Sequence, residues 1–226
     1  MKRILVILVL LLVGVSGNVF ALDISECIKI KDDAKRLTCF DEIYSSSFDK
    51  TVCVKTDAQI RNGIIYLPNK TRPFTGNNLC EYENGQFKSK GKFKDGKKDD
   101  KWTSWYENGQ IKVETNFKDG KADGKWTSWH KNGQMKSEVN YKDGKFDGKM
   151  TWWWVNGQMK SEDIYKDGKR DGKLTEWFEN GQINGEANYK DGKLDGMAFA
   201  WYWNGQKMLE YYYKDGKKDG KHTWWH

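Results

Sequence analysis

Hydrophobic and polar residues alternate along most of the chain with the period of a β-strand. In residues 111–118 every second position is apolar or β-branched, and the positions between are polar. Residues 102–106, just before, are rich in tryptophan, threonine and tyrosine, which favour strands. Asn108-Gly109 lies between these runs and is a strong hairpin signal. The pattern predicts a β-hairpin with one packed and one solvated face, and a type I′ turn in which Asn108 and Gly109 both have positive φ.

This hairpin pattern returns every 24 residues. The phrase Lys-Asp-Gly-Lys keeps the same spacing and predicts a second reversal at Asp119-Gly120, with a kink or bulge at Asp123-Gly124. A fixed period of this length is typical of a solenoid in which each unit packs on its neighbours. The glycines of the predicted Asn-Gly turns are Gly85, Gly109, Gly133, Gly157, Gly181 and Gly205.

Aromatic residues occupy equal positions in successive units. We expect them to stack into ladders that form the core, each pair adding about 0.5 to 1.5 kcal/mol. The predicted fold is therefore an elongated, open, single-layer antiparallel β-hairpin solenoid and not a barrel. The returning strands contribute Phe93, Phe117, Tyr141, Tyr165, Tyr189 and Tyr213, and the outgoing strands contribute Trp105, Trp129, Trp153, Trp177, Trp201 and Trp225.

Further rings adjoin the predicted ladders. Consecutive strand residues point to opposite faces, so one face cannot bury all of these rings. They form a candidate exposed binding strip, because aromatic side chains enrich interfaces and stack on sugars or cationic groups. The alternative is that they only cover a sheet that has no second layer. The strip consists of Tyr106, His130, Trp154, Phe178 and Tyr202.

The first 58 residues differ from the repeats. A basic start, an apolar run to Val15 and small residues before Leu22 predict a signal peptide over residues 1–21, cleaved after Ala21. The mature protein would be periplasmic or secreted, with no transmembrane span after cleavage. Helical spacing of apolar residues after Asp32 and Asp33 predicts a small helical cap and linker over residues 22–58. The repeat array then takes residues 59–226.

Four cysteines precede the regular repeats. An even number in an exported chain indicates two disulfides, and three pairings are possible. We favour the two pairings that close local loops, one of which would staple the helical cap. A metal site is disfavoured because neither a Cys-x-x-Cys motif nor suitably spaced histidines occur. The favoured pairs are Cys27 with Cys39 and Cys53 with Cys80.

The net charge and the types of residue present narrow the classes of function that can be expected. The formal net charge is +7, and lysines and aspartates are interleaved. Nucleic-acid binding would need a concentrated basic face and is not expected, whereas an anionic envelope surface remains possible as a partner. Lysines surround turn aspartates such as Asp119 and Asp123, which disfavours calcium binding. With no trio of nucleophile, base and orienting group, we expect no enzymatic activity, no cofactor and no metal.

The repeat resembles the MORN repeat in its bacterial variant. One unit has the pattern Tyr-Lys-Asp-Gly-Lys-x-Asp-Gly-Lys-x-Thr-x-Trp-Tyr-Glu-Asn-Gly-Gln, and the resemblance runs from about Gly63 to the end of the chain. Asp100, Met197 and Phe199 depart from it. The resemblance implies an elongated hairpin solenoid used for binding or scaffolding, and a bacterial antitoxin family is built on the same variant.

The predicted function is a non-catalytic interaction scaffold of the periplasm or cell envelope, with a protein as its partner. Two alternatives stay open. The exposed rings could bind a glycan or the cell wall, or the protein could be of the antitoxin or immunity type and neutralise a partner toxin.

Overall fold

The computed structural model describes residues 27–36, 51–220 and 222–225. The chain forms two compact units, residues 1–50 and residues 51–226. In the first unit residues 27, 28 and 33–36 are helical, and Asp32 caps the second helical segment by accepting a hydrogen bond from the Lys35 N–H at 2.9 Å. Cys27 is disulfide-bonded. The predicted signal peptide and Cys39 lie outside the described residues.

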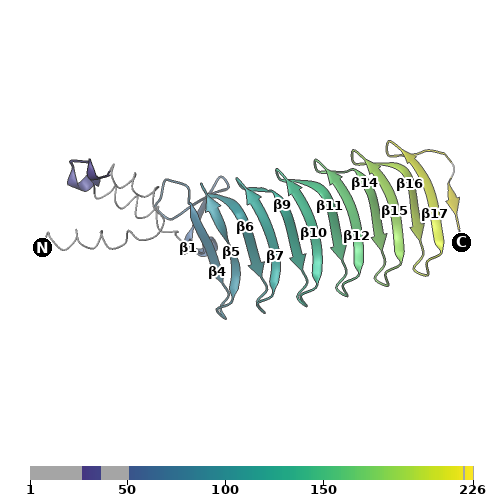
Figure 1. Ribbon diagram of the computed structural model, residues 1–226, viewed down its shortest axis with the longest axis horizontal. Coiled ribbons are helices and arrows are strands. Elements are labelled where there is room, and N and C mark those ends of the chain that lie inside the picture. Colours follow the sequence, from purple (N-terminus) through teal and green to yellow (C-terminus); the bar gives the residue numbers. More distant parts are fainter. Residues whose placement is uncertain (1–26, 37–50, 221, 226) are drawn as a thin grey trace. The chain divides into compact units, whose positions relative to one another are not determined.

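The second unit is an open sheet of consecutive hairpins, which confirms the predicted solenoid (Figure 1). Each main strand pairs antiparallel with the next, while β1 (Thr51–Val52) pairs parallel with β4. The other strands are β4 (Gly76–Glu81), β5 (Phe87–Lys94), β6 (Lys97–Trp105), β7 (Ile111–Lys118), β8 (Lys121–Ala122), β9 (Gly124–Trp129), β10 (Met135–Lys142), β11 (Lys145–Trp153), β12 (Met159–Lys166), β13 (Lys169–Arg170), β14 (Gly172–Trp177), β15 (Ile183–Lys190), β16 (Lys193–Trp201), β17 (Lys207–Lys214), β18 (Lys217–Lys218) and β19 (Thr223–Trp224).

The two reversals of each unit have different geometries. At the Lys-Asp-Gly-Lys turn Asp119 and Gly120 have φ of 51° and 83°, as a type I′ turn requires. At the other turn Gly109 has φ of 83°, but none of the asparagines that precede the six repeat glycines Gly85 to Gly205 has a positive φ. The predicted type I′ turn at Asn108-Gly109 is therefore wrong. The chain instead makes a three-residue loop, closed by the Tyr106 N–H donating to Gln110 O at 2.8 Å, and only its glycine is left-handed.

The turn asparagines link successive units through their side chains. Asn132 Oδ1 accepts the Gln134 N–H at 3.1 Å, and Asn132 Nδ2 donates to Val155 O, in the next unit, at 3.0 Å. Asn84, Asn108, Asn156 and Asn180 each donate to the turn carbonyl of the following unit at 3.0 to 3.3 Å. A row of amides thus joins the Asn-Gly turns along the array.

Replacing Asn132 by alanine should lower the free energy of unfolding by about 1 kcal/mol, because the hydrogen bonds of its side chain at a solvent-exposed turn are lost. The loss should stay near its own turn, since units of a solenoid contact only their neighbours. Hydrogen exchange checks this. The amides around Gly133 and Gly157 should exchange faster, while those of β17 should be unchanged, and faster exchange throughout the array would contradict the expectation.

The predicted kink at the Asp-Gly pair is confirmed. Between Val139 and Tyr141 the register of β10 against β11 shifts, and the extra residues on β11 include Gly148, whose φ is 98°. In alternate units the same feature splits the outgoing strand into two segments, such as β8 and β9.

The first residues of the second unit fold over one end of the sheet. They form helix α4 (Val54–Asp57) and a separate hairpin of β2 (Gln59–Arg61) and β3 (Ile64–Tyr66). The disulfide Cys53–Cys80 ties them to β4, as predicted. β1 and this disulfide join residues 51–58 to the sheet, and the compact unit begins at Thr51. Its hydrophobic core contains Ile65, Phe74, Phe93 and Trp102.

Candidate functional site

The sheet has two faces of different chemistry. Side chains alternate between the faces along each strand, so Trp102 and Phe117 share one face with Thr115, while Thr103 and Glu114 lie on the other. We call the first the aromatic face and the second the ion-pair face.

A continuous series of ring contacts runs along the aromatic face. The Phe117 ring lies between Trp102, at a centroid distance of 6.5 Å, and Trp126, at 5.7 Å. Each contact therefore joins one strand to the next strand of the sheet. The series runs through Phe93, Trp102, Phe117, Trp126, Tyr141, Phe146 and Tyr165.

The observed ring contacts differ from the expected ladders, in which rings at equal positions of successive units stack on one another. Equal positions of successive units lie two strands apart, about 9.6 Å, so their rings need a ring on the strand between them. The Phe117 row has such partners in Trp102 and Trp126, but the row that begins at Trp105 does not. No two tryptophans of that row, all of them described, have rings in contact. Trp105 instead contacts Phe87, Trp201 contacts Phe199, and Trp225 lies under Lys207. Tyr189 lies under Arg170, and Tyr213 contacts Tyr211.

A row of ion pairs runs along the ion-pair face. Lys101 Nζ lies 2.8 Å from Glu114 on the neighbouring strand. The same pair recurs as Lys125–Glu138, Lys149–Glu162 and Lys173–Glu186. Met197 ends the row, and Glu210 pairs instead with Lys207 at 3.0 Å. Exposed pairs of this kind contribute little to stability.

The residues of the candidate binding strip lie beside the Asn-Gly turns and bond to the next unit. The Tyr106 hydroxyl donates to Trp129 O at 2.8 Å, and the Trp154 indole N–H donates to Trp177 O at 3.2 Å. His130 Nε2 lies 3.3 Å from Trp153 O, and the Tyr202 hydroxyl donates to Trp225 O at 3.4 Å. Phe178 has no donor. The strip is therefore a structural link between units, which supports the alternative that its rings cover and join a single-layer sheet.

Replacing Phe178 by tyrosine should raise the free energy of unfolding by about 0.5 to 1 kcal/mol, because the new hydroxyl would reach Trp201 O as its equivalents reach the next unit. Tyr106→Phe is the matched opposite change and should cost a similar amount. Chemical denaturation of the two variants measures both effects. A Phe178→Tyr variant less stable than the wild type would contradict this role.

One ion pair interrupts the aromatic face after Tyr165. Arg170 Nε donates to Asp163 Oδ2 at 2.6 Å and lies 3.3 Å from the Tyr165 hydroxyl, and the guanidinium stacks over Tyr189 at 5.1 Å. Burial opposes ionisation of Arg170, but the hydrogen bond to Tyr165 and the charge of Asp163 outweigh it and raise its pKa above the ordinary value. The equivalent positions hold Ala187 and Leu194 one unit further on.

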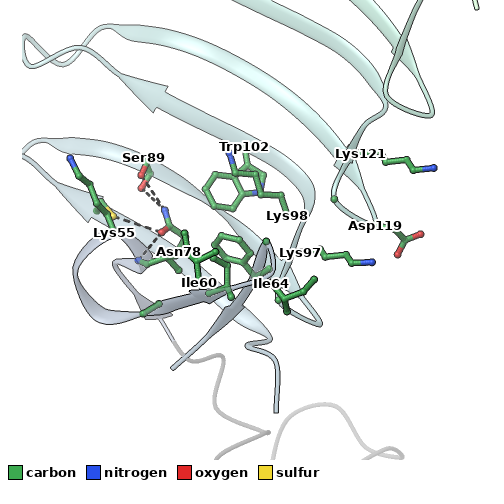
Figure 2. A pocket seen from close by; sticks show the side chains of 18 residues that line it. Lys55, Ile60, Ile64, Asn78, Ser89, Lys97, Lys98, Trp102, Asp119 and Lys121 are labelled. Atoms are coloured by element: carbon green, nitrogen blue, oxygen red, sulfur yellow. Dashed lines mark hydrogen bonds between the residues drawn. The ribbon is translucent and has the colours of Figure 1, made fainter. Parts of the chain in front are cut away.

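A groove of about 750 Å³ lies between the β2–β3 hairpin and the aromatic face (Figure 2). Ile60 and Ile64 of the hairpin form one wall, and Trp102 lies on the sheet side. Asn78 is buried in the floor, where its amide nitrogen donates to Ser89 Oγ at 3.1 Å. The groove is thus apolar, and the polar side chain in its floor is satisfied.

Lysines surround this groove. Figure 2 shows Lys97, Lys98 and Lys121 on one side and Lys55 at the opposite end, with Asp119 as the one acid among the lining residues. The Lys98 ammonium lies 4.6 Å from the centre of the Trp102 ring, and burial lowers its pKa. Within the described part of the chain none of these four ammonium groups forms an ion pair.

Comparison with known families identifies the repeat. The family model of the MORN repeat variant matches residues 101–119, 122–143, 146–167 and 170–191. Four consecutive hairpin units of the sheet therefore carry this signature. Residues 101–191 of the array are identified as variant MORN repeats. MORN repeats are in general modules for protein or membrane interaction and are in general not catalytic. A comparison with curated proteins gave no match.

Some residues of the site were not predicted from the sequence, although they depart from the pattern of their repeat position. Lys98, Arg170 and Lys218 occupy one repeat position, which in the other units holds Ala122, Phe146 or Leu194. Comparing units position by position could have singled them out. The hairpin over the aromatic face also carries a signal, because Asn62-Gly63 lies between its two strands. In residues 27–36, 51–220 and 222–225 no cluster of three or more metal-ligating side chains occurs, and no helix is long and apolar enough to cross a membrane.

Proposed function

We propose that this MORN-repeat protein is an exported, non-catalytic scaffold that binds a protein partner in the periplasm or cell envelope. The observation that carries the proposal is the open sheet itself. Its polar groups are satisfied within the array, with no buried unsatisfied side-chain atom in the described residues, while the aromatic face keeps rings and cations in contact with solvent. A rigid surface of this kind suits recognition of another macromolecule.

Export is tested separately from binding. Expressed with its own leader in a Gram-negative host, the protein should be recovered in the periplasmic fraction with Leu22 as its first residue. N-terminal sequencing of the purified protein measures this. Recovery in the cytoplasm with Met1 retained would overturn the location.

Partner binding is tested by chemical cross-linking in intact cells, followed by purification and mass spectrometry. The proposal expects one protein at stoichiometric yield. Retention on peptidoglycan resin that is lost in Trp154→Ala and Tyr202→Ala variants, without a protein partner, would favour the glycan alternative. A captured partner whose expression alone arrests growth would favour the antitoxin alternative.

A further inference from the structure

We propose that the groove under the β2–β3 hairpin is the site at which this scaffold binds an extended acidic segment of its protein partner, with an apolar side chain inserted against Trp102. This inference rests on the proposed function and names both the surface and the chemistry of the segment. The groove is defined by Ile60 and Ile64 on the hairpin, Trp102 on the sheet, and the lysines around its mouth.

The positive charge of the lysines that line the groove favours an acidic partner. On the ion-pair face, lysines lie at ion-pair distance from glutamates of the neighbouring strand, as in Lys101–Glu114. Among the residues that line the groove, Lys55, Lys97, Lys98 and Lys121 are accompanied by one acid, Asp119. A carboxylate entering here would pair with ammonium groups that have no carboxylate partner within the described residues, and the positive potential would steer an acidic chain toward the groove.

The apolar walls of the groove favour a ligand with an apolar group beside that carboxylate. Ile60 is 70% exposed although it lines the groove, so it offers apolar surface that a ligand would cover. The floor is recessed, with Trp102 9% exposed and Phe93 6% exposed. A flat lipid surface cannot reach these rings beneath the hairpin, whereas a side chain projecting from an extended peptide can.

Strand β2 favours a polypeptide over a small amphiphile. Within the described residues β2 pairs only with β3, and its three residues are exposed. Its outer edge therefore offers backbone N–H and C=O groups to an added strand, a common mode of peptide recognition. The occupant that uses both this edge and the lysines is an extended peptide with alternating acidic and apolar residues.

The binding test uses the full mature protein and a short fluorescein-labelled peptide of alternating glutamate and leucine, followed by fluorescence anisotropy. A lysine and leucine peptide of equal length is the control ligand. The double variant Lys97→Gln/Lys121→Gln should bind the acidic peptide about tenfold more weakly. The matched control Lys145→Gln/Lys169→Gln removes the same charge at the same repeat positions, away from the groove, and should change affinity less than about twofold.

The apolar contribution is tested by Ile60→Ser, which should also weaken binding, with Ile164→Ser, at a 39% exposed isoleucine away from the groove, as its control. Equal weakening by both lysine double variants would show general charge attraction and overturn the proposal, as would equal affinity for the two peptides. Binding to phosphatidylglycerol vesicles without peptide binding would overturn it in favour of an anionic lipid.

The same variants separate this inference from the proposed function. If the cross-linked partner is captured equally by the wild type and by Lys97→Gln/Lys121→Gln, the scaffold function stands and the groove is not its site. If the acidic peptide binds as expected but no partner is captured in cells, the chemistry of the groove stands and the scaffold function falls.

Discussion

Replacing Arg170 by leucine should lower the free energy of unfolding by about 3 kcal/mol, because the Asp163 carboxylate would be left buried without its counter-charge. The Asp163 side chain is 6% exposed and the Arg170 side chain 39%, with Nε and Oδ2 2.6 Å apart. The partial exposure of Arg170 places the effect at the lower end of the range for buried pairs. Chemical denaturation followed by circular dichroism measures it.

The neighbouring unit supplies a matched control. The double variant Asp163→Ala/Arg170→Leu copies the pair Ala187 and Leu194, which occupies the equivalent positions one unit further on. Because no unpaired charge remains, its stability should lie within about 1 kcal/mol of the wild type or exceed it. If the double variant were as unstable as Arg170→Leu, packing and not the lost counter-charge would explain the cost.

Removing the disulfide Cys53–Cys80 by alanine substitution at both positions should cost about 2 to 4 kcal/mol at the N-terminal end of the array. The bond joins residues 27 apart in sequence, so its loss frees a sizeable loop in the unfolded state. In the folded state β1 and α4 keep two parallel pairs with β4, the hydrogen bond from the Val54 N–H to Asn78, and the packing of Val52 and Val54 against the hydrophobic core.

Hydrogen exchange should locate the effect. The amides of β3, β4 and β5 should exchange faster in the double alanine variant, and those of β15 to β17 should match the wild type, because coupling in a solenoid passes only between neighbours. The wild type treated with a thiol reductant should behave in the same way if that bond is reduced. A uniform acceleration along the whole array would contradict the one-dimensional description.

The repeat pattern was sufficient to predict the fold because each unit contains its own strand and turn signals. The alternation at 111–118 indicates a strand, and the glycines every 24 residues mark the reversals. These are local effects of backbone sterics and side-chain direction, so the open hairpin solenoid and the disulfide Cys53–Cys80 could be predicted. The turn at Asn108-Gly109 could not be assigned correctly, because Asn-Gly also suits a three-residue loop in which only the glycine is left-handed.

The sequence could not predict which rings are in contact, because contact depends on the spacing between strands. Equal positions are two strands apart, so the row of Phe117 forms a continuous series only where Trp102, Trp126 or Phe146 lies between its members, and the row of Trp105 does not form one. The strip from Tyr106 to Tyr202 had the pattern of a binding surface, yet its polar atoms bond to the next unit.

The sequence by itself determined the unit, its period and its two reversals, since these follow from residues close together in the chain. The tertiary structure alone decided that the β2–β3 hairpin lies over Trp102, that lysines from two units gather around one groove, and that Asp163 meets Arg170. Those arrangements join residues whose proximity depends on how strands stack and where the first hairpin packs, and no local pattern encodes that distance.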